Sequence, residues 1–222
     1  MAANNYGIRV LMLEEVSFSF PGRTLLDRVS LQLRPAATTC LLGGNGSGKT
    51  TLFNLITGFL RPDSGDIHFG NQELTGRAPF RISRMGVART FQDLRLIGKL
   101  SVRENVLLAL SRHPDERIDR ALLPRRLHGD PDGFDCREAE ALLAEYFIAE
   151  VANQLASEIS YGQQKLLTLA CCAALDASLL LFDEPVAGIS PEYREHIAER
   201  LATLKAAGKT ILLIEHQQDF LE

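Results

Sequence analysis

The stretch Gly43-Gly44-Asn45-Gly46-Ser47-Gly48-Lys49-Thr50 decides how this chain folds. It matches the pattern G-x-x-x-x-G-K-[ST] throughout, follows a short apolar strand at Thr38–Leu42 and opens a helix expected over Lys49–Leu60. Glycines let backbone N–H groups crowd around phosphate oxygens, and a helix N-terminus adds a field that favours negative charge. A glycine-rich turn that only caps a helix is the alternative. Because strand, loop and helix agree, the stretch predicts a phosphate-binding loop in an α/β fold.

Two side chains of this loop have expected roles in nucleotide chemistry. Lys49 would neutralise the β and γ phosphates, and Thr50 would give its hydroxyl to Mg²⁺. The residues expected to surround the nucleotide are Gly43, Gly44, Asn45, Gly46, Ser47, Gly48, Lys49, Thr50 and Thr51.

A second motif, Leu179–Glu184, is a run of four apolar residues that ends in two carboxylates. A buried strand here would carry Asp183 to its C-terminal tip, where ligands bind in such sheets. Asp183 suits the Mg²⁺ shell, through water, and Glu184 suits the general base that polarises an attacking water. An acidic strand end is common by itself. Together with the phosphate-binding loop it predicts a nucleotide hydrolase.

Composition narrows the class of protein further. The 222 residues are 45% hydrophobic and 23% charged, which predicts a globular core. A net charge of −4 disfavours a protein that coats nucleic acid, although a local basic patch stays possible. The longest apolar stretch, Leu166–Phe182, is interrupted by polar residues, so the chain is not expected to cross a membrane alone. The four cysteines are Cys40, Cys136, Cys171 and Cys172. They lack CxxC spacing, which predicts a reducing compartment and no metal site.

The rest of the chain predicts an α/β domain with an insertion. Residues 10–34 alternate like strands around a turn at Pro21-Gly22, and residues 101–154 have a helical pattern. Strands then alternate with helices, which implies a mainly parallel sheet. Further strands are expected at 66–69, 179–182 and 209–214, and further helices at 136–147, 161–175 and 191–206.

A third motif, Ile159-Ser160-Tyr161-Gly162-Gln163-Gln164, precedes the helix expected at 161–175. Here the chain resembles the ATP-binding cassette family, whose signature is usually LSGGQ. Ser160, Gly162 and Gln163 are kept, whereas Ile159 and Tyr161 replace the leucine and the first glycine. A serine before this helix would be an ordinary N-cap, and a capped helix N-terminus is also an anion site. In the family, this signature contacts the γ-phosphate held by a second subunit.

The resemblance assigns three more side chains. Phe20 matches the aromatic residue that stacks on adenine, with Phe18 as a competing candidate. Gln92 matches the glutamine that reaches Mg²⁺ or water and relays the nucleotide state toward a membrane partner. His216 matches the switch histidine that contacts the γ-phosphate. The D-loop position holds Ser190 where the family has aspartate.

Taken over nearly the whole chain, the resemblance implies one α/β nucleotide-binding domain over residues 1–222. It implies an N-terminal antiparallel β portion, a mainly parallel sheet and a helical subdomain inserted at about 93–158. It implies an ATPase that uses ATP and Mg²⁺ and works as a homo- or heterodimer. The implied catalytic residues are Lys49, Gln92, Glu184 and His216, the metal-binding residues are Thr50, Gln92 and Asp183, and Phe20, Ser160, Gly162 and Gln163 join the nucleotide site.

Residues 51–58, 86–92 and 160–164 resemble one subgroup of the family, the ATPase subunits of importers for branched-chain amino acids, urea and short amides. This resemblance implies a peripheral position on the cytoplasmic face of the membrane, partner permeases, a periplasmic or extracellular solute-binding protein that acts indirectly, and no nucleic acid. The alternatives are a soluble cassette ATPase, an ATP-gated module that does not hydrolyse, and the ATPase of a lipid or lipopolysaccharide exporter.

The end of the chain and a basic segment before the helical insertion lead to two further expectations. Family members continue with further strands and a helix, so C-terminal strands are expected to be missing or truncated after Glu222. The segment Arg77–Arg103 is rich in positive charge and predicts either a docking surface near Gln92 or a solvated basic face. Nucleic-acid binding is a further alternative, but the segment has no interleaved aromatic platform. Its basic residues, against the single acidic residue Asp93, are Arg77, Arg81, Arg84, Arg89, Arg95, Lys99 and Arg103.

Overall fold

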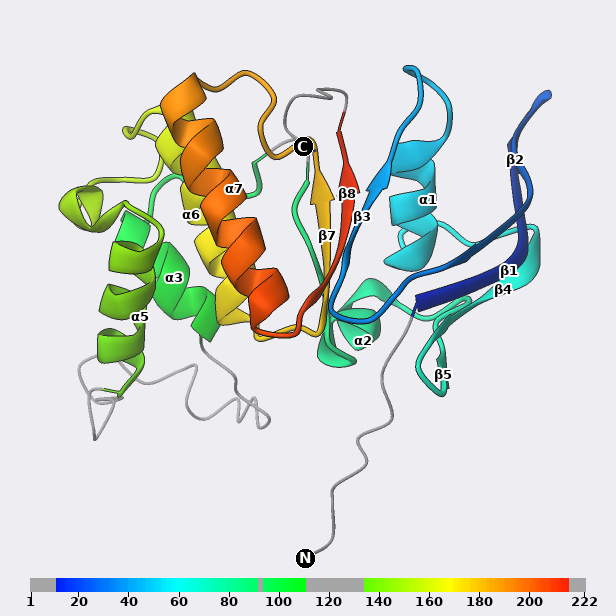
Figure 1. Ribbon diagram of the computed structural model, residues 1–222, viewed down its shortest axis with the longest axis horizontal. Helices are drawn as coiled ribbons and strands as arrows, with labels where there is room; N and C mark the ends of the chain where they lie inside the picture. Colours follow the sequence, from blue (N-terminus) through cyan, green and yellow to red (C-terminus); the bar gives the residue numbers. More distant parts are fainter. Residues whose placement is uncertain (1–10, 92–93, 111–133, 216–222) are drawn as a thin grey trace, which may run out of the picture. The chain divides into compact units, whose positions relative to one another are not determined.

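The computed structural model describes residues 11–91, 94–110 and 134–215 (Figure 1). The chain divides into two compact units. The first contains Met1–Gln92, Asp176–Ala187 and Ile197–Glu222, and the second contains Asp93–Leu175 and Gly188–His196. The second unit contains the predicted insertion at about 93–158 and extends beyond it, to residues 159–175 and 188–196. The single domain over residues 1–222 and the bounds of the insertion stay predictions.

An antiparallel sheet forms the N-terminal part of the first unit. The strands β1 (Leu11–Phe20) and β2 (Arg23–Gln32) pair around the turn at Pro21-Gly22, as the alternating pattern predicts. On its other edge β1 pairs with β4 (Ser64–Phe69), and β5 (Gln72–Glu73) completes the order β2-β1-β4-β5. The predicted antiparallel β portion is therefore confirmed.

A parallel sheet carries the residues of the nucleotide motifs. Its order is β3 (Thr38–Leu41), β8 (Thr210–Ile214), β7 (Leu179–Asp183) and β6 (Val87–Arg89), and every neighbouring pair is parallel. All residues of β7 and β8 are buried, as their unbroken apolar runs predict. The pattern did not predict β6, because three residues between Gly86 and Thr90 are too few to show a period.

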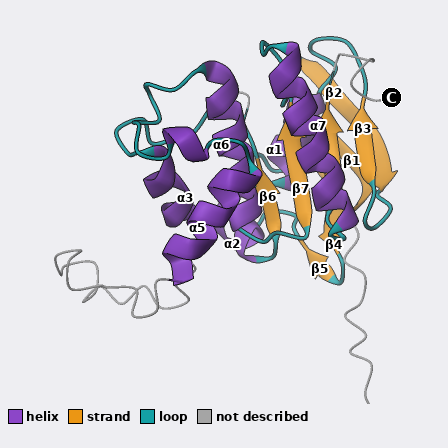
Figure 2. Ribbon diagram, turned by 60° about the vertical axis from the view of Figure 1, so that its left-hand side comes forward, coloured by secondary structure: helices purple, strands orange, loops and turns teal. Residues whose placement is uncertain are grey.

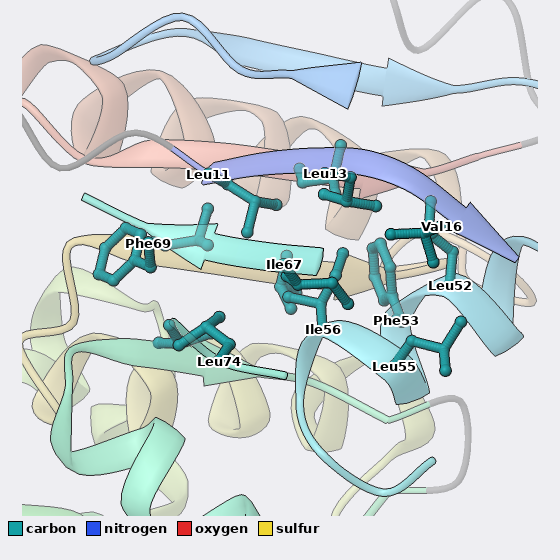
Figure 3. Close-up of a cluster of buried hydrophobic side chains, with 14 of the residues drawn as sticks. Leu11, Leu13, Val16, Leu52, Phe53, Leu55, Ile56, Ile67, Phe69 and Leu74 are labelled. Atoms are coloured by element: carbon teal, nitrogen blue, oxygen red, sulfur yellow. The ribbon is translucent and has the colours of Figure 1, made fainter. Parts of the chain in front are cut away.

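Helix α1 (Lys49–Ile56) lies between the two sheets of the first unit (Figure 1). Its buried residues join those of β1, β4, β7 and β8 in one hydrophobic cluster. Figure 3 shows side chains of that cluster, among them Leu11, Leu13, Val16, Leu52, Phe53, Leu55, Ile56, Ile67, Phe69 and Leu74.

Helix α1 ends four residues before the predicted Leu60. The N–H groups of Phe59 and Leu60 both donate to the carbonyl of Asn54, so the chain leaves the helix axis after Thr57. The Thr57 hydroxyl donates to the Phe53 carbonyl at 2.6 Å and closes the last turn.

Two further helices belong wholly or partly to the first unit. The short α2 (Pro79–Arg84) begins with a proline, and the sequence pattern did not predict it. Helix α7 (Pro191–Ala206) has the predicted bounds. Its residues from Ile197 onward belong to the first unit, where Ile197 and Leu201 are buried.

The described residues of the second unit form helices and loops (Figure 2). They contain α3 (Val102–Leu110), α5 (Phe134–Glu145), the short 3₁₀ helix η2 (Ala149–Val151) and α6 (Tyr161–Ala174). The helices α3, α5 and α6 pack against one another. Within residues 11–91, 94–110 and 134–215, no helix has the length and apolar character that crossing a bilayer requires.

The cysteines differ sharply in exposure. Cys136 on α5 is exposed, whereas Cys172 on α6 is buried and Cys171 beside it is partly buried. Burial raises the pKa of both the Cys171 and the Cys172 thiol to about 12. Only the thiolate is a strong nucleophile, so these two side chains are inert core residues at neutral pH.

At pH 8, iodoacetamide should therefore modify Cys136 in the native protein much faster than Cys171 or Cys172. A thiol with a pKa near 12 is only about one part in ten thousand thiolate at that pH. Mass spectrometry of peptides after timed alkylation measures the three rates, and Cys136→Ser is the control that removes the fast phase. Equal rates at Cys136 and Cys171 would contradict the assignment.

Candidate functional site

The glycine-rich loop joins β3 to α1 in the way that the sequence predicts. Gly48 is the N-cap residue of α1, and its φ of +93° is a conformation that residues with a side chain rarely adopt. A Cβ atom here would also lie 2.9 Å from Leu26 Cδ2. Since Gly48 supplies no side chain to cap the helix, the first N–H groups of α1 are positioned to receive an anion.

Lys49 places its ammonium group at this loop. The Nζ atom donates to the carbonyls of Gly43 at 2.6 Å and Gly44 at 2.9 Å, and to Ser47 Oγ at 3.4 Å. These contacts keep the positive charge where an incoming phosphate would meet it. The loop therefore combines backbone donors, a helix N-terminus and one cation.

A pocket of about 400 Å³ opens over the loop. This volume falls in the range of small-molecule sites. All of its lining residues belong to the first unit. They are Phe20, Arg23, Leu25, Asn45, Gly46, Ser47, Gly48, Lys49, Thr50, Thr51 and Glu184.

The structure separates the two aromatic candidates for adenine stacking. Phe20 is 48% exposed and lines the pocket, whereas Phe18 is 8% exposed and belongs to the hydrophobic cluster. The two rings meet edge to face, with centroids 5.0 Å apart, so Phe18 supports Phe20 from behind. Of these two residues, Phe20 offers a surface for a base.

The end of β7 brings the two predicted carboxylates to different environments. The Asp183 side chain is 1% exposed, and its Oδ2 accepts a hydrogen bond from Arg89 Nη2 at 3.1 Å. Glu184 is partly buried and lines the pocket. Its φ of +51° is a strained backbone conformation, held by the N–H bond to the Ile214 carbonyl at 3.0 Å. The sharp turn explains how adjacent carboxylates take separate positions.

Thr50 in the pocket lining and Asp183 at the end of β7 offer oxygen donors of the kind that a magnesium ion takes. Throughout the described part of the chain, no group of three or more His, Cys, Asp or Glu side chains could hold a metal. Mg²⁺ does not need such a cage, because it keeps several waters and binds one or two protein oxygens together with substrate phosphates. The sequence predicts three oxygen donors for it: the Thr50 hydroxyl, the Asp183 carboxylate and the side chain of Gln92, which lies outside the described residues.

The signature residues lie in the second unit, at the start of α6. Ser160 is the N-cap residue, and its Oγ accepts the N–H of Gln163 at 3.3 Å while Gln163 Oε1 accepts the N–H of Ser160 at 2.9 Å. This capping box is the local role that a helix start predicts. Gly162 is buried against the ring of Tyr193, and Tyr161 is exposed.

Gln92 and His216 lie outside the described residues. Ser190 is exposed, and its carbonyl accepts the N–H of Arg194 at the start of α7. Thr51 lies on α1 and lines the pocket.

Comparison with known proteins identifies the family. Residues 26–187, which include the loop, the signature and both carboxylates, match the family described as ABC transporter. The chain belongs to the ABC transporter family. As an ATP-binding domain of this family it is an ATPase, and the resemblance that its motifs predict is confirmed.

Relatives in the ABC transporter family cover most of the chain. It is 36% identical to the high-affinity branched-chain amino acid transport ATP-binding protein LivG of Escherichia coli, over 93% of this chain and 82% of that protein. It is 34% identical to a probable branched-chain amino acid transport ATP-binding protein LivG of Archaeoglobus fulgidus, over 96% of this chain and 82% of that protein. A solved ATP-binding cassette of an ABC transporter in its ADP conformation has a TM-score of 0.80 at 30% identity, over 96% and 83%. This structural likeness confirms the α/β cassette fold.

Three residues near the site were missed or misplaced by the sequence analysis. Arg23 and Leu25 of β2 line the pocket, and an alternating strand gives no signal for that role. Arg89 was counted with the docking surface or solvated face, but its side chain is 4% exposed. Charge counting could not detect this, since it does not distinguish a buried arginine from an exposed one.

Of the other residues counted in that basic segment, Arg103 forms an ion pair with Glu140, so it also is not a free positive charge. Arg77, Arg81 and Arg84 of the first unit are exposed, as are Arg95 and Lys99 of the second. Asp93 lies outside the described residues. The docking surface itself stays a prediction.

Gly162→Ala should lower the Tm, because a Cβ atom at this position would lie 2.4 Å from Tyr193 Cδ2. Overpacking of this kind costs about 1–3 kcal/mol, which corresponds to roughly 2–12 °C in a chain of this size. Differential scanning fluorimetry measures the shift. Gly44→Ala is the matched control, since a Cβ there meets no atom within 4 Å. A Gly162→Ala protein as stable as the parent would contradict the packing.

Proposed function

We propose that this chain is the ATP-hydrolysing subunit of an importer for branched-chain amino acids or related amides. The observation that carries the proposal is its similarity to the LivG proteins, which extends over 93–96% of the chain. The pocket at the start of α1 supports the ATP-dependent part of the proposal. The subunit would work on the cytoplasmic face of the membrane.

ATP binding would use groups already gathered in the first unit. The N–H groups at the start of α1 and the ammonium of Lys49 face the phosphates, and the exposed ring of Phe20 stacks on adenine. Asn45, Gly46, Ser47, Gly48, Thr50 and Thr51 line the pocket beside them. Mg²⁺, held by Thr50, Asp183 and Gln92, would neutralise phosphate charge.

Hydrolysis would be assisted by Glu184 as the general base. Its carboxylate accepts a proton from the attacking water as the water oxygen bonds to the γ-phosphorus, and the bond to the β-phosphate oxygen breaks to release ADP. Lys49 stabilises the charge that develops on the phosphate oxygens. His216 and Gln92 are proposed, from the family resemblance, to contact the γ-phosphate and the attacking water.

The complete site would be shared between two ATPase subunits, identical or different. Ser160, Gly162 and Gln163 of one subunit would contact the γ-phosphate held by the loop of the other. The exposed position of Ser160 at the start of α6 is compatible with such a contact. Two chains would then close on ATP and separate after hydrolysis.

Transport would require permease subunits in the membrane, coupled to this opening and closing. A periplasmic or extracellular solute-binding protein would deliver the solute to the permeases and touch this chain only indirectly. None of the residues assigned above needs to contact the solute. The solute class therefore rests on the LivG relatives alone.

Glu184→Gln should bind ATP and hydrolyse it at least about a hundredfold more slowly, because the amide cannot accept the proton from water. Phosphate release measures turnover, and equilibrium titration with a fluorescent ATP analogue measures binding. Lys49→Ala is the contrasting control, expected to lose most nucleotide affinity. Turnover of Glu184→Gln near that of the parent would remove Glu184 from this role.

Co-purification tests the transport function. The tagged chain, extracted from its source membranes in mild detergent, should bring down multi-span permease subunits that mass spectrometry can identify. Solute uptake by vesicles that contain the recovered complex would then define the solute. A catch of only soluble proteins, with none of the chain in the membrane pellet, would support a soluble cassette ATPase instead.

A further inference from the structure

Arg89 makes a buried ion pair with the aspartate at the end of β7. Arg89 Nη2 lies 3.1 Å from Asp183 Oδ2, and the two side chains are 4% and 1% exposed. A carboxylate removed from water to this degree depends on hydrogen bonds and an opposite charge for its stability. The geometry of this pair therefore bears directly on a carboxylate assigned to nucleotide chemistry.

Further contacts hold the guanidinium group in place. Its Nη1 atom donates to Asn54 Oδ1 at 2.6 Å and approaches Thr57 Oγ1 at 3.4 Å, both on or next to α1. The Cζ atom lies 5.2 Å from the centroid of the Phe53 ring and 4.8 Å from that of Phe91. The guanidinium group of Arg89 thus contacts Asp183, residues of α1, and Phe91 in the segment that follows β6.

The arrangement connects three motifs of the first unit. Helix α1 begins at Lys49 of the phosphate-binding loop, and β6 leads through Thr90 and Phe91 into Gln92. The neighbouring Thr90 completes the attachment, because its Oγ1 accepts the N–H of Asp183 at 3.2 Å. Consecutive residues of one segment therefore hold both the side chain and the backbone of Asp183.

We propose that Arg89 is a positioning residue that orients the Asp183 carboxylate for the magnesium–nucleotide complex. The proposal rests on the proposed function, since it presupposes that Asp183 supports Mg²⁺. The forked guanidinium donates to Asn54 through one nitrogen and to Asp183 through the other, which a lysine ammonium cannot reproduce with the same geometry. Partners of this kind behind a metal-binding side chain tune metal affinity without touching the metal.

The test measures how strongly nucleotide binding depends on Mg²⁺. A mant-labelled β,γ-imido analogue of ATP, which is not hydrolysed, is titrated into the full chain with EDTA and then with increasing Mg²⁺. Arg89→Met should leave the affinity in EDTA within about twofold and weaken the apparent affinity for Mg²⁺ by about 10- to 100-fold. An unchanged Mg²⁺ dependence would overturn the proposal. So would a stronger affinity, which would make Arg89 a competitor of the metal.

Arg84→Met is the matched control. Arg84 is an exposed residue of α2 with its guanidinium 5.9 Å from the Phe80 ring, so its removal deletes the same charge without touching Asp183. Its Mg²⁺ dependence should equal that of the parent. If Arg84→Met weakens Mg²⁺ as much as Arg89→Met, the effect belongs to net charge and the proposal fails.

A double-mutant cycle asks whether Arg89 acts through Asp183. Asp183→Asn should weaken the Mg²⁺ dependence, and adding Arg89→Met should produce little further loss, because the oriented carboxylate is already gone. If the double variant lost Mg²⁺ affinity by the product of the two single losses, Arg89 would not act through Asp183 and the proposal would be overturned. This readout separates positioning from a purely structural role, which would not depend on the residue at position 183.

Arg89→Lys keeps the test decisive if Arg89→Met does not fold, which circular dichroism and Tm would show. The lysine retains the charge and loses the fork, so a loss of about threefold or more in Mg²⁺ affinity supports the proposal. A folded Arg89→Lys protein with the parental Mg²⁺ dependence overturns it.

Binding of the analogue by the unmodified chain separates failure of the proposed function from failure of the role of Arg89. If it binds the analogue no better than Lys49→Ala does, in EDTA or in Mg²⁺, the proposed function and the inference fall together. If it shows a clear Mg²⁺ dependence that Asp183→Asn abolishes and Arg89→Met preserves, only the role of Arg89 fails.

Discussion

The packing of α1 between an antiparallel and a parallel sheet constrains the rest of the first unit. Its buried side chains share one hydrophobic cluster with β1, β4, β7 and β8. Phe53 has no exposed surface, and its ring also faces the guanidinium of Arg89. Packing on both sides fixes where the N-terminus of the helix lies, and with it the position of the N–H groups that can receive an anion.

Burial of β7 creates an electrostatic requirement at its C-terminal end. The strand is apolar over most of its length and terminates in a carboxylate that is almost completely buried. Arg89 of the adjacent parallel strand β6 and Thr90, which follows that strand, meet the requirement with a guanidinium and a hydroxyl. Glu184 turns away through a strained backbone conformation and reaches the pocket. Stability and chemistry thus share the same few residues.

Prediction from sequence succeeded where a pattern is long or a motif is complete. The loop at 43–50, the apolar run of β7 and the helix Pro191–Ala206 carry strong local signals, and the family follows from them. Prediction failed for β6 and α2, whose few residues show no period, and for the end of α1 at Ile56. It also counted Arg89 as a docking or surface charge, because burial is not a local property.

The sequence by itself determined the chemistry of the chain: a loop that can hold phosphate, two carboxylates after an apolar strand, and membership in the ABC transporter family. Motifs of this kind are short and contiguous, so they can be recognised in the sequence without knowledge of the fold. Only the tertiary structure decided that Phe20 rather than Phe18 faces the pocket and that Arg89 is the partner of Asp183. Those outcomes depend on which residues, distant in the chain, the two sheets bring together and which they bury.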